Sequence, residues 1–161
     1  MHIPDKISKW IRAKNWTLHE HQIRMFKSSE CSSQLLIAPT GSGKTLAGFL
    51  PTIADLYLNP SQKLHTLYIS PLKALASDIK RNLETPIKEL DLKISVEDRT
   101  GDTKQSIKKK QRVIPPNILL TTPESLALLM SYPEAPSIFS SLKRVIVDEI
   151  HAITESKRGD Q

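Results

Sequence analysis

The chain has 161 residues, a net charge of +6 and a single cysteine, Cys31. One cysteine excludes an intramolecular disulfide framework and a cysteine metal cluster, and it favours a reducing compartment. The positive charge suits a polyanionic partner such as nucleic acid, but many basic proteins bind none. No window reaches the ~18 uninterrupted apolar residues of a membrane span. We therefore expect a cytoplasmic protein without a membrane partner.

Two short helices are predicted before residue 30. Residues 5–14 place Ile7, Trp10 and Ile11 at i, i+3 and i+4, which is the spacing of an amphipathic helix. The second helix covers residues 19–28 and carries Gln22. A glutamine amide donates and accepts, so Gln22 can read an adenine edge; the alternative is a solvated helix residue.

A strand, a glycine-rich loop and a helix are predicted around residue 40. The apolar run 35–37 indicates the strand, and residues 44–58 indicate the helix, which Pro51 is expected to kink or break. The loop matches the pattern G-x-x-x-x-G-K-[ST] except that Ala38 replaces the first glycine. The residues expected to bind a nucleotide are Thr40, Gly41, Ser42, Gly43, Lys44 and Thr45.

Each residue type in this loop suits a phosphate group. Gly41 and Gly43 can adopt positive φ and let the backbone approach an anion, and the helix N-terminus adds partial positive charge. Lys44 can reach the β- and γ-phosphates, and the Thr45 hydroxyl can bind Mg²⁺. The alternative is a chance turn before a helix, which the strand-loop-helix context disfavours.

The remainder of the chain alternates strands and helices. Strands are predicted over 65–70, 94–97, 118–121 and 144–147, and helices over 72–90, over 104–113 as a basic helix or loop, and from Pro123 onward. Near-continuous apolar strands that alternate with helices indicate an α/β fold, with a mostly parallel sheet buried between helices on both faces.

Polar residues follow several of these strands. In a parallel sheet the ligand binds beyond the carboxyl ends of the strands, where Ser70, Thr122 and Asp148 are expected. Asp148 can hold Mg²⁺ through water, and Glu149 can orient or deprotonate an attacking water. The alternative is a helix cap or solvated turn. His151 is a candidate for coupling this site to a neighbouring surface.

Cations, hydroxyls and helix N-termini also suggest contacts with nucleic-acid phosphates. The run 108–112 is basic as well, although a solvated charged face explains it equally well. The residues expected to contact nucleic acid are Lys73, Arg99, Thr100, Gly101, Thr122, Pro123 and Glu124.

These motifs together resemble superfamily 2 helicases of the DExH type. Residues 38–45 are similar to motif I, 70–75 to motif Ia, and 148–151 to motif II, while 99–103 and 121–126 are similar to two nucleic-acid-contacting motifs. The sequences of these motifs are most similar to those of the large helicase-related (Lhr) family, particularly its ligase-associated DNA damage response branch. The resemblance implies a RecA-like fold, ATP and Mg²⁺ as cofactors, and ATP-driven translocation on and unwinding of nucleic acid. The implied partner is single-stranded or partly duplex DNA, or RNA.

The resemblance also implies residue roles and a location. Lys44, Asp148 and Glu149 would be catalytic, and Gln22 would belong to an adenine-contacting segment. The protein would act in DNA repair in the bacterial cytosol or nucleoid. Two departures from the family pattern bear on the assignment to this branch. Asn15 precedes Trp16 where glycine is commoner, and Ile150 stands where the branch often has tryptophan.

The chain ends ten residues after His151, whereas family members continue into a second RecA-like lobe. We therefore expect residues 1–30 to form N-terminal helices with the adenine-contacting segment, and residues 31–161 to form the first lobe, truncated after motif II. Without the arginine of the second lobe, this chain should hydrolyse ATP and unwind poorly.

Three functions remain open from the sequence. The first is an ATP-dependent helicase lobe. The second is a nucleic-acid-binding remnant without ATP turnover. The third is an unrelated phosphate-loop enzyme such as a kinase, which the helicase-like motifs disfavour.

Overall fold

The structure of the protein is a computed structural model, and the residues that it describes are 3–28, 33–39 and 41–154. The predicted domain boundary after residue 30 falls outside these ranges, so that division stays a prediction. None of the helices in the described ranges combines the length and hydropathy that crossing a bilayer requires.

The chain divides into two compact units. The first consists of Met1–Pro60 and Glu89–Leu92, and the second of Ser61–Lys88 and Lys93–Gln161. Each unit has buried apolar residues of its own.

The first unit is helical. Its helices are α1 (Asp5–Ala13), α2 (Glu20–Lys27) and α3 (Lys44–Leu58). The predicted apolar stripe of α1 is confirmed, because Ile7 and Ile11 are buried. On the same helix the Trp10 indole donates to Glu89 Oε2 at 2.7 Å. Hydrogen bonds from Lys14 and Trp10 lower the pKa of Glu89, which ties α1 to the Glu89–Leu92 segment.

The predicted strand in this unit is wrong, and so is one of the two outcomes predicted for Pro51. Residues 33–39 form no strand, and Leu35 and Ile37 are 73 % and 87 % exposed. An apolar run becomes a strand only when its backbone pairs with a neighbour, and these residues take part in no ladder. Pro51 was expected to kink or break its helix, and the break does not occur, because α3 runs through Pro51, which is buried. The kink stays a prediction.

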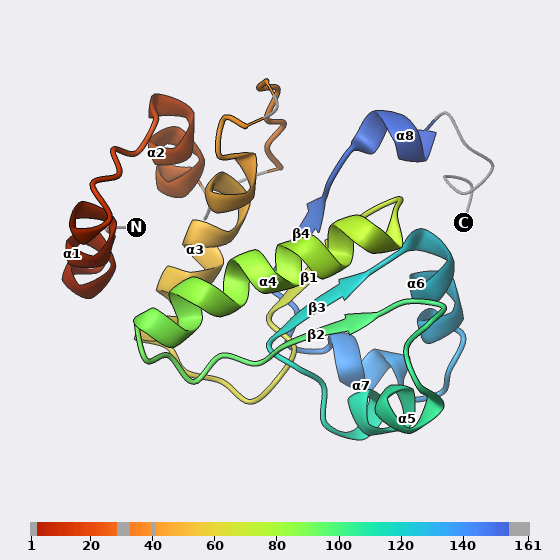
Figure 1. Cartoon of the computed structure of the whole chain (residues 1–161). Coiled ribbons are helices and arrows are strands. Elements are labelled where there is room, and N and C mark those ends of the chain that lie inside the picture. The colour runs from red at the N-terminus through yellow and green to blue at the C-terminus, as the bar shows by residue number, and fades with distance from the viewer. Residues whose placement is uncertain (1–2, 29–32, 40, 155–161) are drawn as a thin grey trace. The chain divides into compact units, whose positions relative to one another are not determined.

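The second unit contains the parallel sheet that the sequence predicts (Figure 1). Its strands lie in the order β2-β3-β1-β4, and all three pairings are parallel. The strands are β1 (Thr66–Ile69), β2 (Val96–Arg99), β3 (Ile118–Thr121) and β4 (Arg144–Val147). Strand β2 begins and ends two residues later than predicted, while the other strands match within one residue at each end.

Helices follow each strand. They are α4 (Lys73–Glu89), α5 (Gln105–Val113), α6 (Pro123–Met130), α7 (Ala135–Phe139) and α8 (Ile150–Thr154). The short helices α7 and α8 were not predicted. Five residues are too few for a clear helical period, and in α7 the buried Ala135 and Ile138 provide the stabilising contacts.

The two faces of the sheet carry different helices. Leu67 and Leu119 pack in one cluster with Leu129 of α6 and Ile138 of α7. Side chains alternate between faces along a strand, so Tyr68, Leu120 and Asp98, which pair in register, lie on the opposite face. Helix α4 covers that face, because its Lys80 reaches Asp98 at 2.9 Å (Figure 1).

Burial on both faces is confirmed for the inner strands only. All residues of β3 are buried, whereas Val145 and Val147 of β4 are 52 % and 43 % exposed. Within the described residues, β4 is an edge strand of a four-stranded sheet.

Candidate functional site

The glycine-rich loop has the backbone conformation that its sequence predicts. Gly41 and Gly43 both have φ of 77°, in the left-handed region that favours glycine. The Lys44 ammonium donates to Ala38 O at 2.8 Å and to Pro39 O at 3.1 Å. Lys44 thus bonds to neutral carbonyl oxygens of its own loop, and a charged phosphate oxygen is a stronger acceptor for the same ammonium group.

The loop continues directly into α3. Lys44 and Thr45 are the first two residues of that helix, where backbone N–H groups have no intrahelical partner. The Ser42 hydroxyl donates to Pro39 O at 2.7 Å and so closes the turn. Thr40 lies outside the described residues, and the predicted role of that residue stays a prediction.

Gln22 is not a solvated helix residue. It is 3 % exposed, its Oε1 accepts from the backbone N–H of His19 at 2.8 Å, and its Nε2 donates to Gly43 O at 3.1 Å. The first bond caps α2 and the second joins α2 to the glycine-rich loop. The predicted contact of Gln22 with adenine stays a prediction, while its contact with the loop is an addition from the structure.

In the second unit, the predicted polar residues meet at one edge of the sheet. Ile69 pairs with both Thr121 and Val147, so all three strands end at the same level. Ser70, Thr122 and Asp148 follow these strand ends directly. This is the edge at which parallel α/β sheets bind ligands.

The Asp148 carboxylate is held by two donors. The Tyr68 hydroxyl donates to its Oδ2 at 2.6 Å, and the backbone N–H of Glu149 donates to its Oδ1 at 2.9 Å. Burial, followed by the hydrogen bond to Asp148, raises the pKa of Tyr68 well above its usual range. The phenol therefore stays protonated and acts as a donor.

Glu149 has an unusual backbone conformation. Its φ is 48°, in the left-handed region that non-glycine residues seldom occupy. Residues with such a conformation cluster at functional sites. Its Oε2 lies 3.5 Å from His151 Nε2 in α8. The predicted motif thus lies at the junction of the two elements, with Asp148 and Glu149 between β4 and α8 and His151 in the first turn of α8.

The turn after β2 differs from its prediction at one residue. Arg99 is 1 % exposed, and its guanidinium donates to Lys108 O at 3.0 Å and to Gln111 Oε1 at 3.3 Å. Burial lowers the pKa of Arg99. Both acceptors belong to α5, so the Arg99 side chain faces that helix and supports the turn. It is not available to a phosphate in this structure.

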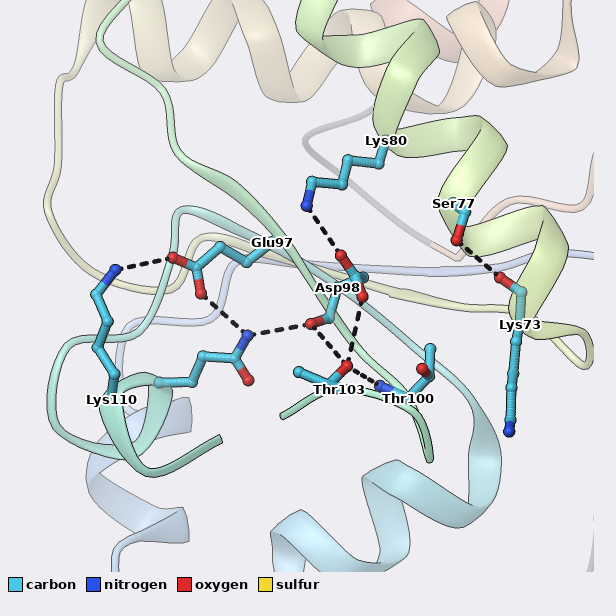
Figure 2. A network of polar contacts seen from close by, with 9 residues as sticks. Lys73, Ser77, Lys80, Glu97, Asp98, Thr100, Thr103 and Lys110 are labelled. Carbon is cyan, nitrogen blue, oxygen red and sulfur yellow. Dashed lines mark hydrogen bonds and ion pairs between the residues drawn. The ribbon is translucent and has the colours of Figure 1, made fainter. Parts of the chain in front are cut away.

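A polar network holds the same turn in place (Figure 2). Asp98 accepts from Lys80 at 2.9 Å, and the hydrogen bond raises the pKa of Lys80. Thr103 Oγ1 accepts from the backbone N–H of Thr100 at 2.9 Å. On the other side of β2, Glu97 accepts from Lys110 at 3.2 Å.

Lys73 and the tip of the turn lie together. Lys73 is the first residue of α4, and its ammonium lies 2.9 Å from Asp102 Oδ1. A Cβ added at Gly101 would lie 3.1 Å from the same ammonium. Two predicted nucleic-acid motifs, 70–75 and 99–103, therefore present one surface.

The third nucleic-acid motif forms a helix start, as predicted. Thr122 is the N-cap of α6 and accepts from the backbone N–H of Ser125 at 3.4 Å. Pro123 and Glu124 occupy the first turn. Their contacts with nucleic acid stay predictions.

Sequence reasoning missed three residues that organise these sites. Tyr68 holds Asp148, Asp102 pairs with Lys73, and Gln111 accepts from Arg99. One signal was available: Tyr68 is a tyrosine inside an otherwise apolar strand, where its hydroxyl needs a partner.

The fold and site define a P-loop nucleotide-binding domain of the RecA-like class, as predicted. The chain matches the DEAD/DEAH box helicase family over residues 19–161 and belongs to that family. Among its relatives, the ATP-dependent helicase Lhr-Core protein 2 of Thermococcus barophilus is 40 % identical, over 98 % of this chain and 20 % of the relative. The Lhr helicase/probable uracil glycosylase of Mycolicibacterium smegmatis is 45 % identical, over 81 % of this chain and 10 % of the relative.

A solved structure supports the same assignment. The structure of Mycobacterium smegmatis helicase Lhr bound to ssDNA and AMP-PNP is similar with a TM-score of 0.87 and 39 % identity, over 98 % of this chain and 21 % of that chain. The predicted resemblance to Lhr is thereby confirmed, while the ligase-associated branch stays a prediction. The chain spans about a fifth or less of the length of these relatives.

Proposed function

We propose that this chain is the ATP-binding lobe of an Lhr-type, ATP-dependent DNA helicase. The observation that carries the proposal is the Asp148 carboxylate, fixed at the carboxyl end of β4 and followed by Glu149 in a left-handed conformation. The names of the relatives, and the AMP-PNP and ssDNA bound to the Mycobacterium smegmatis Lhr, support ATP and DNA as ligands.

The residues present fit a magnesium nucleotide. Mg²⁺ prefers oxygen ligands and is commonly held by one or two carboxylates together with phosphate oxygens. Asp148 is such a carboxylate, and the predicted role of the Thr45 hydroxyl is to supply an oxygen of the same kind. No cluster of three or more acidic, histidine or cysteine side chains occurs among the described residues. The bound ion would neutralise charge on the phosphates.

The chain's own residues have distinct tasks in this proposal. Lys44 and the backbone of Gly41 and Gly43 bind phosphate oxygens. Glu149 orients the attacking water and accepts its proton. Catalysis then depends on positioning and charge neutralisation, without a covalent intermediate on the protein.

The nucleic-acid surface is proposed for Lys73, the turn at Thr100 and Gly101, and the α6 N-terminus at Thr122. These groups offer a cation, backbone donors and a hydroxyl, which contact phosphates without reading sequence. Single-stranded or partly duplex DNA is the proposed partner, with RNA as the competing substrate in the test. We also propose that a second RecA-like lobe completes the motor.

Nucleotide binding is tested on the 161-residue chain with a fluorescent ATP analogue. Lys44→Ala should weaken binding by at least 10-fold, because the loop loses the charge that faces the phosphates. The matched control is Lys63→Ala, which removes an exposed lysine outside the predicted motifs. Absent binding by the wild type, or equal binding by Lys44→Ala, would contradict the proposal.

Nucleic-acid binding is tested by fluorescence anisotropy with labelled single-stranded DNA and RNA of the same sequence. Lys73→Ala should weaken binding several-fold. It should also reduce the slope of the logarithm of the binding constant against the logarithm of the salt concentration by about one, which corresponds to one lost phosphate contact. Lys93→Ala is the control, because Lys93 is an exposed lysine outside the motifs. Tighter binding of RNA than of DNA would redirect the proposal to an RNA helicase.

A further inference from the structure

Tyr68 is the only aromatic residue in the four strands of the described sheet. It is 2 % exposed and lies on the face covered by α4, opposite the cluster around Leu67. An aliphatic residue would fill this place in β1 without a polar atom. The phenol brings a hydroxyl group to the site that holds Asp148.

The strand register explains how the hydroxyl reaches Asp148. Tyr68 pairs with Ile146, and Asp148 lies two residues further along, on the same face as Ile146. The backbone N–H of Asp148 donates to Ile69 O at 2.9 Å, which continues the ladder past the end of β4. The backbone of Asp148 is thus fixed to β1, the same strand that carries Tyr68.

The two donors fix the orientation of the carboxylate. Oδ2 accepts from Tyr68 at 2.6 Å and Oδ1 accepts from the Glu149 N–H at 2.9 Å, so rotation of the carboxylate would break both bonds. Each oxygen still has a second lone-pair direction available for a metal ion or its water. Hydrogen bonds to an ionised acceptor are short and strong, and the Tyr68 bond has that length.

We propose that Tyr68 is a positioning residue that orients the Asp148 carboxylate toward the divalent cation of the bound nucleotide. This inference rests on the proposed function, in which Asp148 holds that cation. Partners of metal ligands typically contribute a 10- to 100-fold difference in metal affinity. The competing explanation is that Tyr68 merely fills the sheet and Asp148 satisfies its hydroxyl.

The test replaces Tyr68 with phenylalanine, which removes one oxygen and keeps the ring. The control is Tyr132→Phe, the same chemical change at a tyrosine that packs on the opposite face of the sheet. Each protein is titrated with Mn²⁺ in the presence of AMP-PNP, and NMR line broadening is followed at the amides of residues 146–151. Affinity for AMP-PNP in EDTA is measured separately.

The expected result is that Tyr68→Phe needs about 10-fold more Mn²⁺ for half-maximal broadening, with unchanged AMP-PNP affinity in EDTA. Tyr132→Phe should match the wild type in both measurements. An unchanged Mn²⁺ midpoint in Tyr68→Phe would overturn the inference. A second hydroxyl-free variant, Tyr68→Met, should show the same shift; a shift that follows the loss of thermal stability instead would indicate a structural role and would also overturn it.

Failure of the proposed function gives a different pattern. Wild-type protein that binds no AMP-PNP either with Mn²⁺ or in EDTA would contradict nucleotide binding, and the Mn²⁺ titration without nucleotide would then still compare the tyrosine variants. Wild-type protein that shows no broadening near Asp148 under either condition would overturn both proposals.

Discussion

Two loops of this molecule carry predicted binding residues, yet they are held in different ways. The glycine-rich loop before α3 is shaped by two positive φ angles and by bonds from Lys44 and Ser42 to their own loop. The turn after β2 is shaped by side chains from α4, α5 and β2, among them Lys80 and Asp98 (Figure 2). The buried Arg99 supports the same turn through its bond to Lys108 O.

The difference concerns which groups are left for a ligand. In the glycine-rich loop the residues that shape the loop, such as Lys44, are also those expected to bind the ligand, so binding must rearrange their bonds. In the turn, Lys80, Arg99 and Gln111 shape the backbone, which leaves its tip at Gly101 and Asp102 exposed. A ligand can therefore contact the tip while the bonds of Lys80, Arg99 and Gln111 stay in place.

The largest effect is expected for Gly43→Ala. The left-handed conformation costs about 1–2 kcal/mol for a residue with a Cβ, and that Cβ would clash with Gln22 Nε2, so the bond to Gly43 O should be lost as well. We expect a loss of about 3 kcal/mol in the free energy of unfolding, measured by urea denaturation. Gly41→Ala is the control, because it has the same φ and no atom within 4 Å of the added Cβ. Equal losses would show that the Gln22 contact does not matter.

Arg99→Met should give the next largest effect. The substitution leaves Lys108 O and Gln111 Oε1 without their buried donor, which should lower the free energy of unfolding by about 2 kcal/mol. The control Arg112→Met removes a more exposed arginine that also lies over the Tyr132 ring, at 4.2 Å, and should cost less than about 1 kcal/mol. A stable Arg99→Met protein with weakened DNA binding would instead support a direct phosphate contact.

The smallest effect concerns pH and the Lys80–Asp98 pair. The pKa of Lys80 is raised, mainly by its hydrogen bond to Asp98, so the stabilisation is complete below the ordinary lysine pKa and is lost as pH rises through the higher folded-state pKa. The free energy of unfolding of the wild type should exceed that of Lys80→Met by no more than about 1 kcal/mol at pH 7. This difference, measured by urea denaturation at several pH values, should shrink above about pH 10.5. The control Arg81→Met disrupts an exposed pair on the same helix, and its effect should not change in that range because arginine stays charged. A difference for Lys80→Met that is constant with pH would contradict this assignment.

Much of the fold follows from local patterns in the sequence. Helix α1 follows from the spacing of Ile7 and Ile11, and α6 follows from Thr122 and Pro123, because caps and apolar periods act within a few residues. The parallel sheet follows from apolar runs that alternate with helices. The apolar run 35–37 was misread for the same reason, since its pattern is that of a strand and only pairing could decide.

The sequence by itself determined the chemical groups and their spacing: a glycine-rich loop that can adopt positive φ, a lysine and threonine at a helix start, and an acidic pair after a strand. These features are local, so the residues alone specify them. The tertiary structure alone decided that Tyr68 holds Asp148, that Arg99 is buried against α5, and that Lys73 meets Asp102. Each of these contacts depends on strand register and on which helix covers which face, and neither is set until distant segments pack together.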